Sequence, residues 1–323
     1  MKAVAPTRAG GPEVLQVQHR EVVLPDPGQV VIKVHAAGVN RHDINQRNRG
    51  HGPAGSTDVL GLEVAGEVVC IGEGVDPSLH SRKVAALTDG GGYADYALAD
   101  AALLLDWPDS LKAIEAAALP EALFTLQLNI VELAALGSGD WLLIHGGTSG
   151  IGMTGIPFAA LLGAQTIVTS GSDAKCARAM KRGATAAINY RSKDFVAAVR
   201  EVTDGRGADV ILDTVGGQYA LRNIEAMAPD GRLVHLSPAA PDFCVPLRAL
   251  MAKRARVTGS LLRALPLLRK VALADAIRAT VWPHITTKLL PVIDRVFPLE
   301  HAADAHTYMD SGNHMGKIVL TTR

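Results

Sequence analysis

The chain has 323 residues, of which 48% are hydrophobic and 20% charged, and its 32 basic side chains balance 32 acidic ones. This length is enough for two domains with separate cores, and the composition is that of a globular protein. The balanced charge gives no reason to expect nucleic acid or an acidic membrane as a partner. We also expect no signal peptide at the start of the chain and no stretch that approaches a membrane span.

Cysteine usage indicates a reducing environment. The three cysteines, Cys70, Cys176 and Cys244, show no CxxC spacing. The sequence therefore predicts neither a disulfide framework nor a structural zinc site, and we expect the protein in the cytoplasm.

The first hundred residues are rich in predicted strands. Short strand patterns at 2–4, 15–19 and 30–35 are separated by turn sequences, and a further strand is predicted at 60–71, with glycines at 61, 66 and directly after it at 72. A polar helix is predicted at 40–46. This pattern predicts a compact, strongly curved all-β domain.

From residue 110 onward the pattern becomes one of helices and strands. Helices are predicted at 110–119 and 122–136 from their 3.6-residue period. Six strands follow, separated by helix-length or loop segments, at Trp141, Thr166, Ala186, Asp209, Arg232 and Val257. This alternation predicts an α/β domain with a doubly wound parallel six-stranded sheet.

The last sixty residues no longer follow this alternation. A leucine-rich helical region to residue 279 precedes a strand at 291–297, a helix at 300–309 and a strand at 316–320. We predict that these pieces complete the first domain. The expected domains are thus 1–122 with 262–323, and 123–261.

A glycine-rich turn lies between the first two strands of the predicted parallel sheet. Glycine reverses the chain sharply there, lets the backbone approach phosphates, and lets the next helix pack closely on the strand. The turn is not a strict GxGxxG, because Ser149 occupies one of the small positions. An ordinary α/β turn without ligand is the alternative to a dinucleotide site at Gly146, Gly147, Thr148, Ser149, Gly150 and Ile151.

The chain resembles the zinc-independent quinone oxidoreductase (zeta-crystallin-like) branch of the medium-chain dehydrogenase/reductase superfamily. Five segments carry the resemblance, in the expected order: AAGVNRHD (36–43), GLEVAG (61–66), HGGTSGIG (145–152), GADVILDTVGG (207–217) and GKIVL (316–320). The resemblance implies a GroES-like catalytic domain, an inserted Rossmann domain, a nicotinamide cofactor and a homodimer.

Zinc ligands of the superfamily are missing. Its zinc-dependent alcohol dehydrogenases have cysteine where this chain has Asn40, and Gly-His-Glu where it has Gly61-Leu62-Glu63. The four-cysteine lobe that holds their structural zinc is also missing. His42 and Glu63 alone cannot supply the three ligands of a catalytic zinc, so we expect no metal.

NADPH is the expected cofactor. NAD-selective units usually end their second strand with an acidic residue, which would repel a 2′-phosphate. Here that strand ends in small uncharged residues, and Asp173 after it is more often a helix-dipole partner than a ribose ligand. By resemblance, the 2′-phosphate and adenine are held by Ser170, Gly171, Ser172, Lys175 and Tyr190.

The resemblance also implies residues near the nicotinamide. On one side of the cleft these are Asn40, Thr125, Leu236 and Ser237, and on the other Asn313 and Lys317. As alternatives, Thr125 is a mid-helix threonine and Asn313 a turn residue.

No proton donor is certain. Water can protonate a hydroquinone anion, so a quinone reductase needs no dedicated acid. The candidates in the expected pocket are Asn40, His42, Asp43 and His51. His51 and Asn45 stand where other members of the family have tyrosines, which leaves the identity of the substrate open.

Three functions remain open. The leading one is an NADPH-dependent, metal-free oxidoreductase that transfers hydride to a small-molecule quinone or enone. The second is an enoyl-thioester reductase, which needs a proton donor for the α-carbon. The third is an NADPH-binding sensor or structural protein with little turnover.

Overall fold

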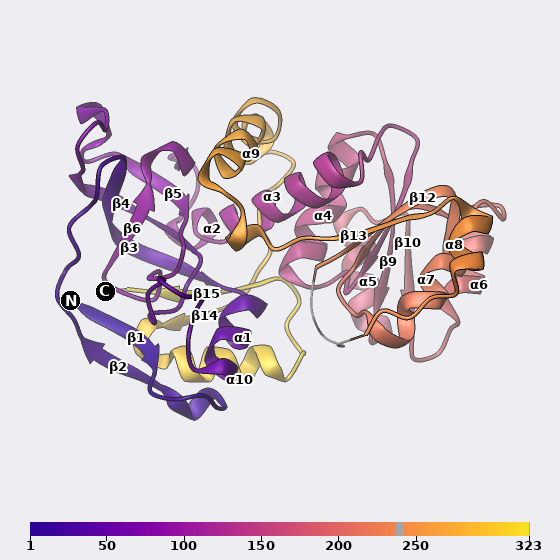
Figure 1. Ribbon diagram of the computed structural model, residues 1–323, viewed down its shortest axis with the longest axis horizontal. Coiled ribbons are helices and arrows are strands. Elements are labelled where there is room, and N and C mark those ends of the chain that lie inside the picture. Colours follow the sequence, from indigo (N-terminus) through magenta and orange to yellow (C-terminus); the bar gives the residue numbers. More distant parts are fainter. Residues whose placement is uncertain (237–241, 323) are drawn as a thin grey trace. The chain divides into compact units, whose positions relative to one another are not determined.

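The computed structural model describes residues 1–236 and 242–322, and its chain divides into two units (Figure 1). Unit 1 consists of Met1–Leu123 and Pro266–Arg323, and unit 2 of Phe124–Leu265. The sequence places these boundaries at 122/123 and 261/262. Each unit is described by itself below.

Unit 1 is built on a mixed seven-stranded sheet with β3 at its centre. The strand order is β14-β15-β3-β4-β5-β7, with β6 also paired to β3, and β1 and β2 form a separate antiparallel pair. The strands are β1 Lys2–Pro6, β2 Leu15–His19, β3 Gln29–Val39, β4 Glu63–Ile71, β5 Lys83–Leu87, β6 Tyr96–Asp100, β7 Leu104–Asp106, β14 Ile293–Pro298 and β15 Lys317–Thr321.

Both parts of the chain build this sheet. β15 pairs antiparallel with β3, and β14 pairs parallel with β15. Val30, Ile32, Ile318 and Leu320 belong to one buried cluster, so the returning segment contributes to the same core as the first strands. Burial of this apolar surface is what holds the two segments together.

Helices close the sheet of unit 1. The first of them, α1 (Arg41–Arg49), ends at Gly50, whose left-handed backbone (φ 79°) lets its amide bond the carbonyls of Gln46 and Arg47. The others are α2 Ala113–Ala116, α9 Leu267–Thr280 and α10 Ala302–Asp310, with 3-10 turns η1 Pro12–Val14, η2 Pro77–Leu79, η3 Ala101–Leu103, η7 Trp282–His284 and η8 Leu299–His301.

The helices predicted at 110–119 and 122–136 are wrong in extent. Only α2 forms in the first range, because Pro120 disfavours a helical conformation for the residue before it. Pro120 instead begins α3 (Pro120–Leu126), where its missing N–H costs nothing, and the π-helix η4 (Gln127–Leu133) follows.

The segment Ala113–Leu133, which contains α2 and α3, meets a length and hydropathy criterion for a membrane-spanning helix. Contrary to the expectation that no stretch approaches a membrane span, it is long and apolar enough to cross a membrane by length and composition, although 78% of its most apolar 18-residue stretch is buried in the structure. Core helices with buried apolar residues meet the same criterion.

The predicted doubly wound parallel sheet of six strands is confirmed in unit 2. Its order is β10-β9-β8-β11-β12-β13, and every pair is parallel. The chain therefore reverses its direction of winding between the neighbours β8 and β11. The strands are β8 Trp141–His145, β9 Gln165–Ser170, β10 Ala186–Asn189, β11 Ala208–Asp213, β12 Met227–His235 and β13 Arg256–Gly259.

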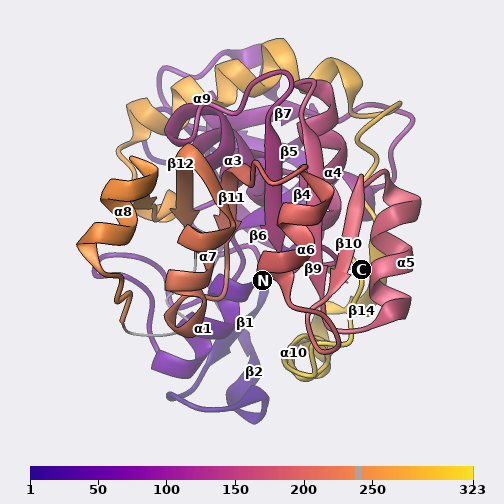
Figure 2. The same cartoon turned by 90° about the vertical axis from the view of Figure 1, so that its right-hand side faces the viewer.

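Helices cover both faces of this sheet. Figure 1 shows α4 and α5 on one side and α6 and α7 on the other, and in Figure 2 α7 lies between α6 and α8. A continuous apolar strand such as Leu142–Ile144 is buried on both faces by this arrangement. The helices are α4 Gly150–Leu161, α5 Asp173–Arg182, α6 Phe195–Val202, α7 Ala220–Ala226 and α8 Leu247–Lys253, with 3-10 turns η5 Gly217–Tyr219 and η6 Leu262–Ala264.

Two glycines let α4 lie close to the turn and to the sheet. A β-carbon on Gly147 would lie 2.3 Å from Cβ of Val168, on β9. One on Gly152 would lie 2.6 Å from backbone atoms of Gly146 and Gly147. Since backbone cannot rotate away, glycine at 152 is a packing requirement of the turn.

We predict that Gly152→Ala destabilises the protein by about 1 to 3 kcal/mol, because the new methyl group forces α4 away from the turn. The free energy of unfolding in urea measures the effect. Gly137→Ala is the matched control: its β-carbon would have Asp140 Oδ2 as nearest neighbour at 4.0 Å, and its stability should stay within about 0.5 kcal/mol. Equal losses in both variants would contradict the packing argument.

Candidate functional site

The glycine turn of unit 2 presents the start of a helix at the carboxyl end of β8. Gly146 adopts φ +76°, and the Gly147 amide donates to the Thr169 carbonyl at 2.9 Å, which ties the turn to β9. Ser149 caps α4, because its Oγ accepts the Gly152 amide at 3.0 Å. The amides of Gly150 and Ile151 have no intrahelical acceptor, as at every helix start, and they are suited to an anion.

The end of β9 forms the second part of this site. Ser170 is buried, and its hydroxyl has no hydrogen-bond partner in the described part of the chain. A β-carbon on Gly171 would lie 2.8 Å from the Tyr190 hydroxyl, so the tyrosine ring lies close over the glycine. Ser172 caps α5 by accepting the Lys175 amide at 3.3 Å. The structure thus brings together Ser170, Gly171, Ser172 and Tyr190.

Asp173, the acidic residue near the end of β9, forms a hydrogen bond within the protein. Its Oδ1 accepts a hydrogen bond from the side-chain amide of Asn189 at 2.7 Å, and Asp173 is the first residue of α5. Both observations fit a helix-terminal carboxylate that is stabilised by the helix dipole.

In unit 1, a buried ion pair lies beside the start of α1. The Lys317 ammonium donates to Glu63 Oε1 and, at 2.7 Å, to Asn40 Oδ1. The Asn40 side-chain amide donates to the same Glu63 oxygen at 2.8 Å, and the Glu121 backbone amide donates to the other at 2.9 Å. Glu63 and Lys317 expose 0% and 4% of their side chains, so the charges compensate each other inside the protein.

A second buried chain of polar groups begins at Asp43. Its carboxylate accepts the Asn40 amide at 2.8 Å, the Gly61 amide at 3.0 Å and the Tyr93 hydroxyl at 3.3 Å. The Tyr93 hydroxyl also lies 3.1 Å from Nε2 of His306. Arg47, which pairs with Asp310 at 2.9 Å, continues the chain from Nδ1 of that histidine.

Burial raises the pKa of the acid, Asp43, and lowers the pKa of the base, His306. Burial, partly offset by the hydrogen bonds from Asn40 and Gly61, raises the pKa of Asp43 to about 6. Burial and the nearby Arg47 guanidinium lower the pKa of His306 to about 3. His306 is therefore neutral at pH 7.

The other predicted residues that the structure describes lie elsewhere in the two units. His51 is exposed, and its Nδ1 lies 2.8 Å from the carbonyl of the next residue. Asn313 is exposed beside Ser311, and Thr125 is buried in α3. His42 lies on α1 and Leu236 directly after β12, whereas Ser237 lies outside the described residues.

Glu63 was not among the predicted site residues, although it lies at the centre of the ion pair. Its signal in the sequence is a carboxylate at the start of the largely apolar strand pattern that also contains Glu67. Within residues 1–236 and 242–322, no group of three or more His, Cys, Asp or Glu side chains is arranged to hold a metal ion.

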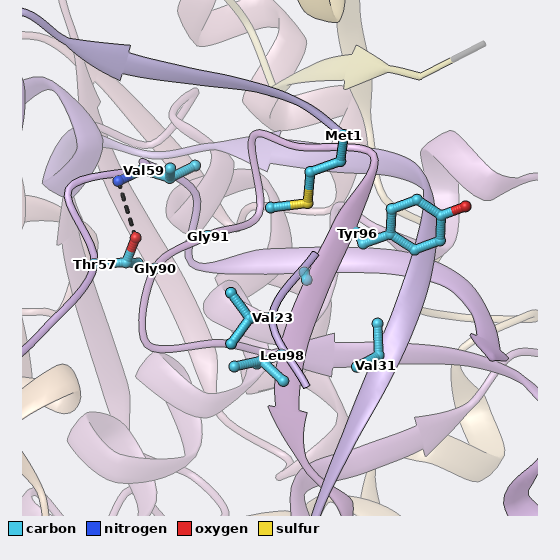
Figure 3. A pocket seen from close by; sticks show the side chains of 10 residues that line it. Met1, Val23, Val31, Thr57, Val59, Gly90, Gly91, Tyr96 and Leu98 are labelled. Atoms are coloured by element: carbon cyan, nitrogen blue, oxygen red, sulfur yellow. Dashed lines mark hydrogen bonds between the residues drawn. The ribbon is translucent and has the colours of Figure 1, made fainter. Parts of the chain in front are cut away.

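Unit 1 also contains an apolar hollow of about 440 Å³ that is open to solvent. Figure 3 shows Met1, Val23, Val31 and Leu98 around it, with the Thr57 hydroxyl bonded to the Val59 amide at its edge. Apart from Thr57 and Tyr96 the lining side chains are apolar, and none of the lining side chains is acidic or basic like Asp, Glu, His, Lys or Arg.

Comparisons with known proteins agree with this geometry. The family model "Alcohol dehydrogenase GroES-like domain" matches residues 26–109, and the model "Zinc-binding dehydrogenase" matches residues 182–320. A quinone oxidoreductase from Sus scrofa is 30% identical over 99% of this chain and 97% of its own length. The chain belongs to the quinone oxidoreductase branch of the medium-chain dehydrogenase/reductase superfamily.

Relatives in this branch have several named activities. A 2-haloacrylate reductase from Burkholderia is 31% identical over 97% of this chain and 96% of its own length. A phenolphthiocerol/phthiocerol polyketide synthase subunit from Mycobacterium tuberculosis is 33% identical over 92% of this chain, which spans only 14% of that relative's length.

Solved structures of the branch share the fold. An Escherichia coli quinone oxidoreductase complexed with NADPH has a TM-score of 0.88 and 26% identity, covering 99% of this chain and 100% of the other. The JamJ enoyl reductase has a TM-score of 0.88 and 25% identity, covering 100% and 99%. Members of this family bind NADP(H), and the chain is an oxidoreductase of this superfamily.

The raised pKa of Asp43 has a defined effect on stability. Because the pKa of Asp43 is higher in the folded than in the unfolded protein, protonated Asp43 stabilises the fold below pH 3.8, and this stabilisation is lost as the pH rises to about 6. A shift of about two pKa units corresponds to a loss of at most about 3 kcal/mol in the free energy of unfolding, and we predict that Asp43→Asn removes this pH-dependent loss.

Urea unfolding midpoints of both proteins across this range test the prediction. His306 titrates in the opposite sense and is common to both proteins, so only the difference between them reports on Asp43. Parallel curves for the two proteins would exclude the assignment.

Proposed function

We propose that this chain is an NADPH-dependent reductase of quinones or related conjugated carbonyls that works without a metal. The observation that carries the proposal is the end of β9, where an unpartnered, buried Ser170 hydroxyl follows a glycine turn with free helix-terminal amides. The site is polar, and no carboxylate that the structure describes points at it. A dinucleotide with a 2′-phosphate needs such a site, because a carboxylate would repel the phosphate.

The residues of unit 2 would hold the dinucleotide. The amides of Gly150 and Ile151 suit the pyrophosphate, and Ser170, Ser172 and Lys175 suit a 2′-phosphate. The E. coli structural neighbour was solved with NADPH, which supports the same choice here. When bound, the dihydronicotinamide supplies hydride, and the protein supplies orientation and electrostatics.

In unit 1, Lys317 and Asn40 would orient polar groups of the reacting partners. The Lys317 charge is compensated by Glu63, which leaves a rigid, nearly neutral arrangement rather than a free cation. The same pairing occupies Glu63, which supports the proposal that hydride transfer here uses no zinc.

An enoyl-thioester reductase is the second candidate. The JamJ enoyl reductase and the 2-haloacrylate reductase support it, because both names refer to reduction of a carbon–carbon double bond. A sensor or structural role with little turnover is the third, and tight NADPH binding without oxidation by any acceptor would favour it.

We also propose a homodimer that forms at the edge of the six-stranded sheet. β13 pairs only with β12 in the sheet order, and all four of its residues are exposed. An open edge strand is a template for pairing with a second copy. The free thiols of Cys70, Cys176 and Cys244 fit a cytoplasmic location.

We expect a quinone to be reduced with NADPH preferred over NADH. The measurement is cofactor oxidation with an ortho-quinone, a para-quinone and an enoyl thioester offered in parallel to metal-free protein. Turnover of the thioester alone would assign the chain to the enoyl reductases. Binding of NADPH without any turnover would contradict both enzyme proposals.

We predict that Lys175→Ala raises the Michaelis constant for NADPH by on the order of tenfold and that for NADH far less, because about 1 to 2 kcal/mol of charge-assisted bonding to the 2′-phosphate is lost. Lys181→Ala, at the other end of α5, is the control and should change neither constant. Equal effects of Lys175→Ala on both cofactors would remove this lysine from the phosphate site.

A further inference from the structure

A histidine and a buried carboxylate lie side by side at the carboxyl edge of the unit 2 sheet. Asp213 and His235 are the last residues of β11 and β12 and are directly opposite in the strand register. His235 Nδ1 lies 3.1 Å from Asp213 Oδ2. The Asp213 side chain is fully buried, whereas His235 keeps 24% of its side chain exposed.

The carboxylate is held in place by the turn that follows β11. Asp213 Oδ1 accepts the Val215 amide at 2.8 Å and the Gly216 amide at 3.1 Å. Gly216 has φ +68°, and a β-carbon there would lie 2.8 Å from Cε1 of His235. The close approach of this glycine fixes the imidazole ring on one side, and the carboxylate fixes it on the other.

This geometry fixes the roles of the two ring nitrogens. Nδ1 donates its proton to Asp213, which leaves Nε2 as the nitrogen that can exchange a proton. No residue that the structure describes hydrogen-bonds Nε2. By contrast, both ring nitrogens of the buried His145 are engaged, with Thr169 Oγ1 at 2.9 Å and Asn223 Oδ1 at 2.8 Å.

The pair lies at the edge where open α/β sheets bind ligands. Ligands of such sheets lie beyond the carboxyl ends of the strands, at the point where the strand order reverses, here between β8 and β11. The Thr214 hydroxyl donates to the His145 carbonyl at 3.1 Å, so the residue after Asp213 is tied to the end of β8. His235 is therefore two strands away from the glycine turn on the same edge.

We propose that His235, oriented by Asp213, donates a proton from Nε2 to the α-carbon of a conjugated carbonyl substrate. This inference rests on the proposed reductase function and deepens it, because it favours acceptors with a polarised carbon–carbon double bond. Hydride from the dinucleotide adds to the β-carbon and leaves an enolate. The His235 imidazolium then gives its Nε2 proton to the α-carbon, so that the N–H bond breaks as the C–H bond forms, and the neutral ring keeps its Nδ1 proton hydrogen-bonded to Asp213 until water reprotonates Nε2.

Reduction of a quinone does not need a protein group as proton donor. The anion formed by hydride transfer is protonated on oxygen and is weakly basic, so water can supply the proton. The proposal therefore predicts that loss of His235 affects the two classes of acceptor unequally, which a merely structural role would not do.

Few charged groups face the pair. β11 contributes Asp213, while Gly259 of β13 is opposite His235 in the strand register and Gly216 lies against its ring. Behind the carboxylate, His145 and Tyr219 interact electrostatically with Asp213. In unit 1, burial and the Glu63 carboxylate raise the pKa of Glu121 to about 8, so Glu121→Gln is included as a comparison variant.

The test uses the full chain with NADPH and compares an enone or enoyl thioester with a quinone. We expect His235→Ala to lower kcat for the enone by at least about 100-fold, the lower end of the range typical of a positioned acid, and to change quinone reduction by less than about twofold. Added imidazole should restore part of the lost rate. His301→Ala removes the exposed partner of Asp304 and is the matched control, expected to be silent.

Two further measurements do not depend on turnover. The dissociation constant for NADPH should be unchanged in His235→Ala. In the cofactor-free protein, the ring ¹⁵N shifts of His235 should place the proton on Nδ1, and this tautomer preference should be lost in Asp213→Asn.

The outcomes separate the proposals. Equal loss for both acceptors, weakened NADPH binding, or a loss that Glu121→Gln shows instead of His235→Ala would overturn the role of His235. An unaltered His235 tautomer preference in Asp213→Asn would overturn the pairing. If the natural protein reduces no acceptor at all, the reductase function fails, while the ring ¹⁵N shifts still test the pair.

Discussion

The structure of unit 1 depends on compensating one buried carboxylate. Glu63 lies in the centre of the sheet with no exposed surface, and an uncompensated charge there would cost several kcal/mol. Lys317, Asn40 and the Glu121 amide together satisfy both of its oxygens. These partners come from the last strand, the start of α1 and the start of α3, so one carboxylate fixes the positions of three segments that are distant in sequence.

Much of the fold could be predicted because it is encoded locally. The central strands β8 and β11 contain the apolar runs Leu142–Ile144 and Val210–Leu212, and each of the six strands is separated from the next by enough residues for a crossover. The two helices before them were misjudged because apolar periodicity continues through Pro120, whereas the backbone cannot. The π-helix at Gln127–Leu133 has no signal in the spacing of apolar residues, since its distinguishing feature is a hydrogen-bond pattern.

The candidate site was predictable where its residues are neighbours in sequence. Gly146 to Ile151 and Ser170 to Ser172 are each one turn, and turn chemistry is local. Glu63 and Asp213 were missed because their partners, Lys317 and His235, are brought to them only by strand pairing. Strand register decides such contacts, and a single sequence contains no direct record of it.

The two-part construction of unit 1 has a consequence for synthesis of the chain. Lys317 lies 254 residues after Glu63, so the carboxylate lacks its cationic partner until the final strand has left the ribosome. Unit 2, by contrast, is one continuous segment and has all of its strands available earlier. Co-translational folding can therefore complete the parallel sheet first, while the β-rich unit waits with an exposed sheet edge at β3, which is the stage most open to aggregation and to recognition by chaperones.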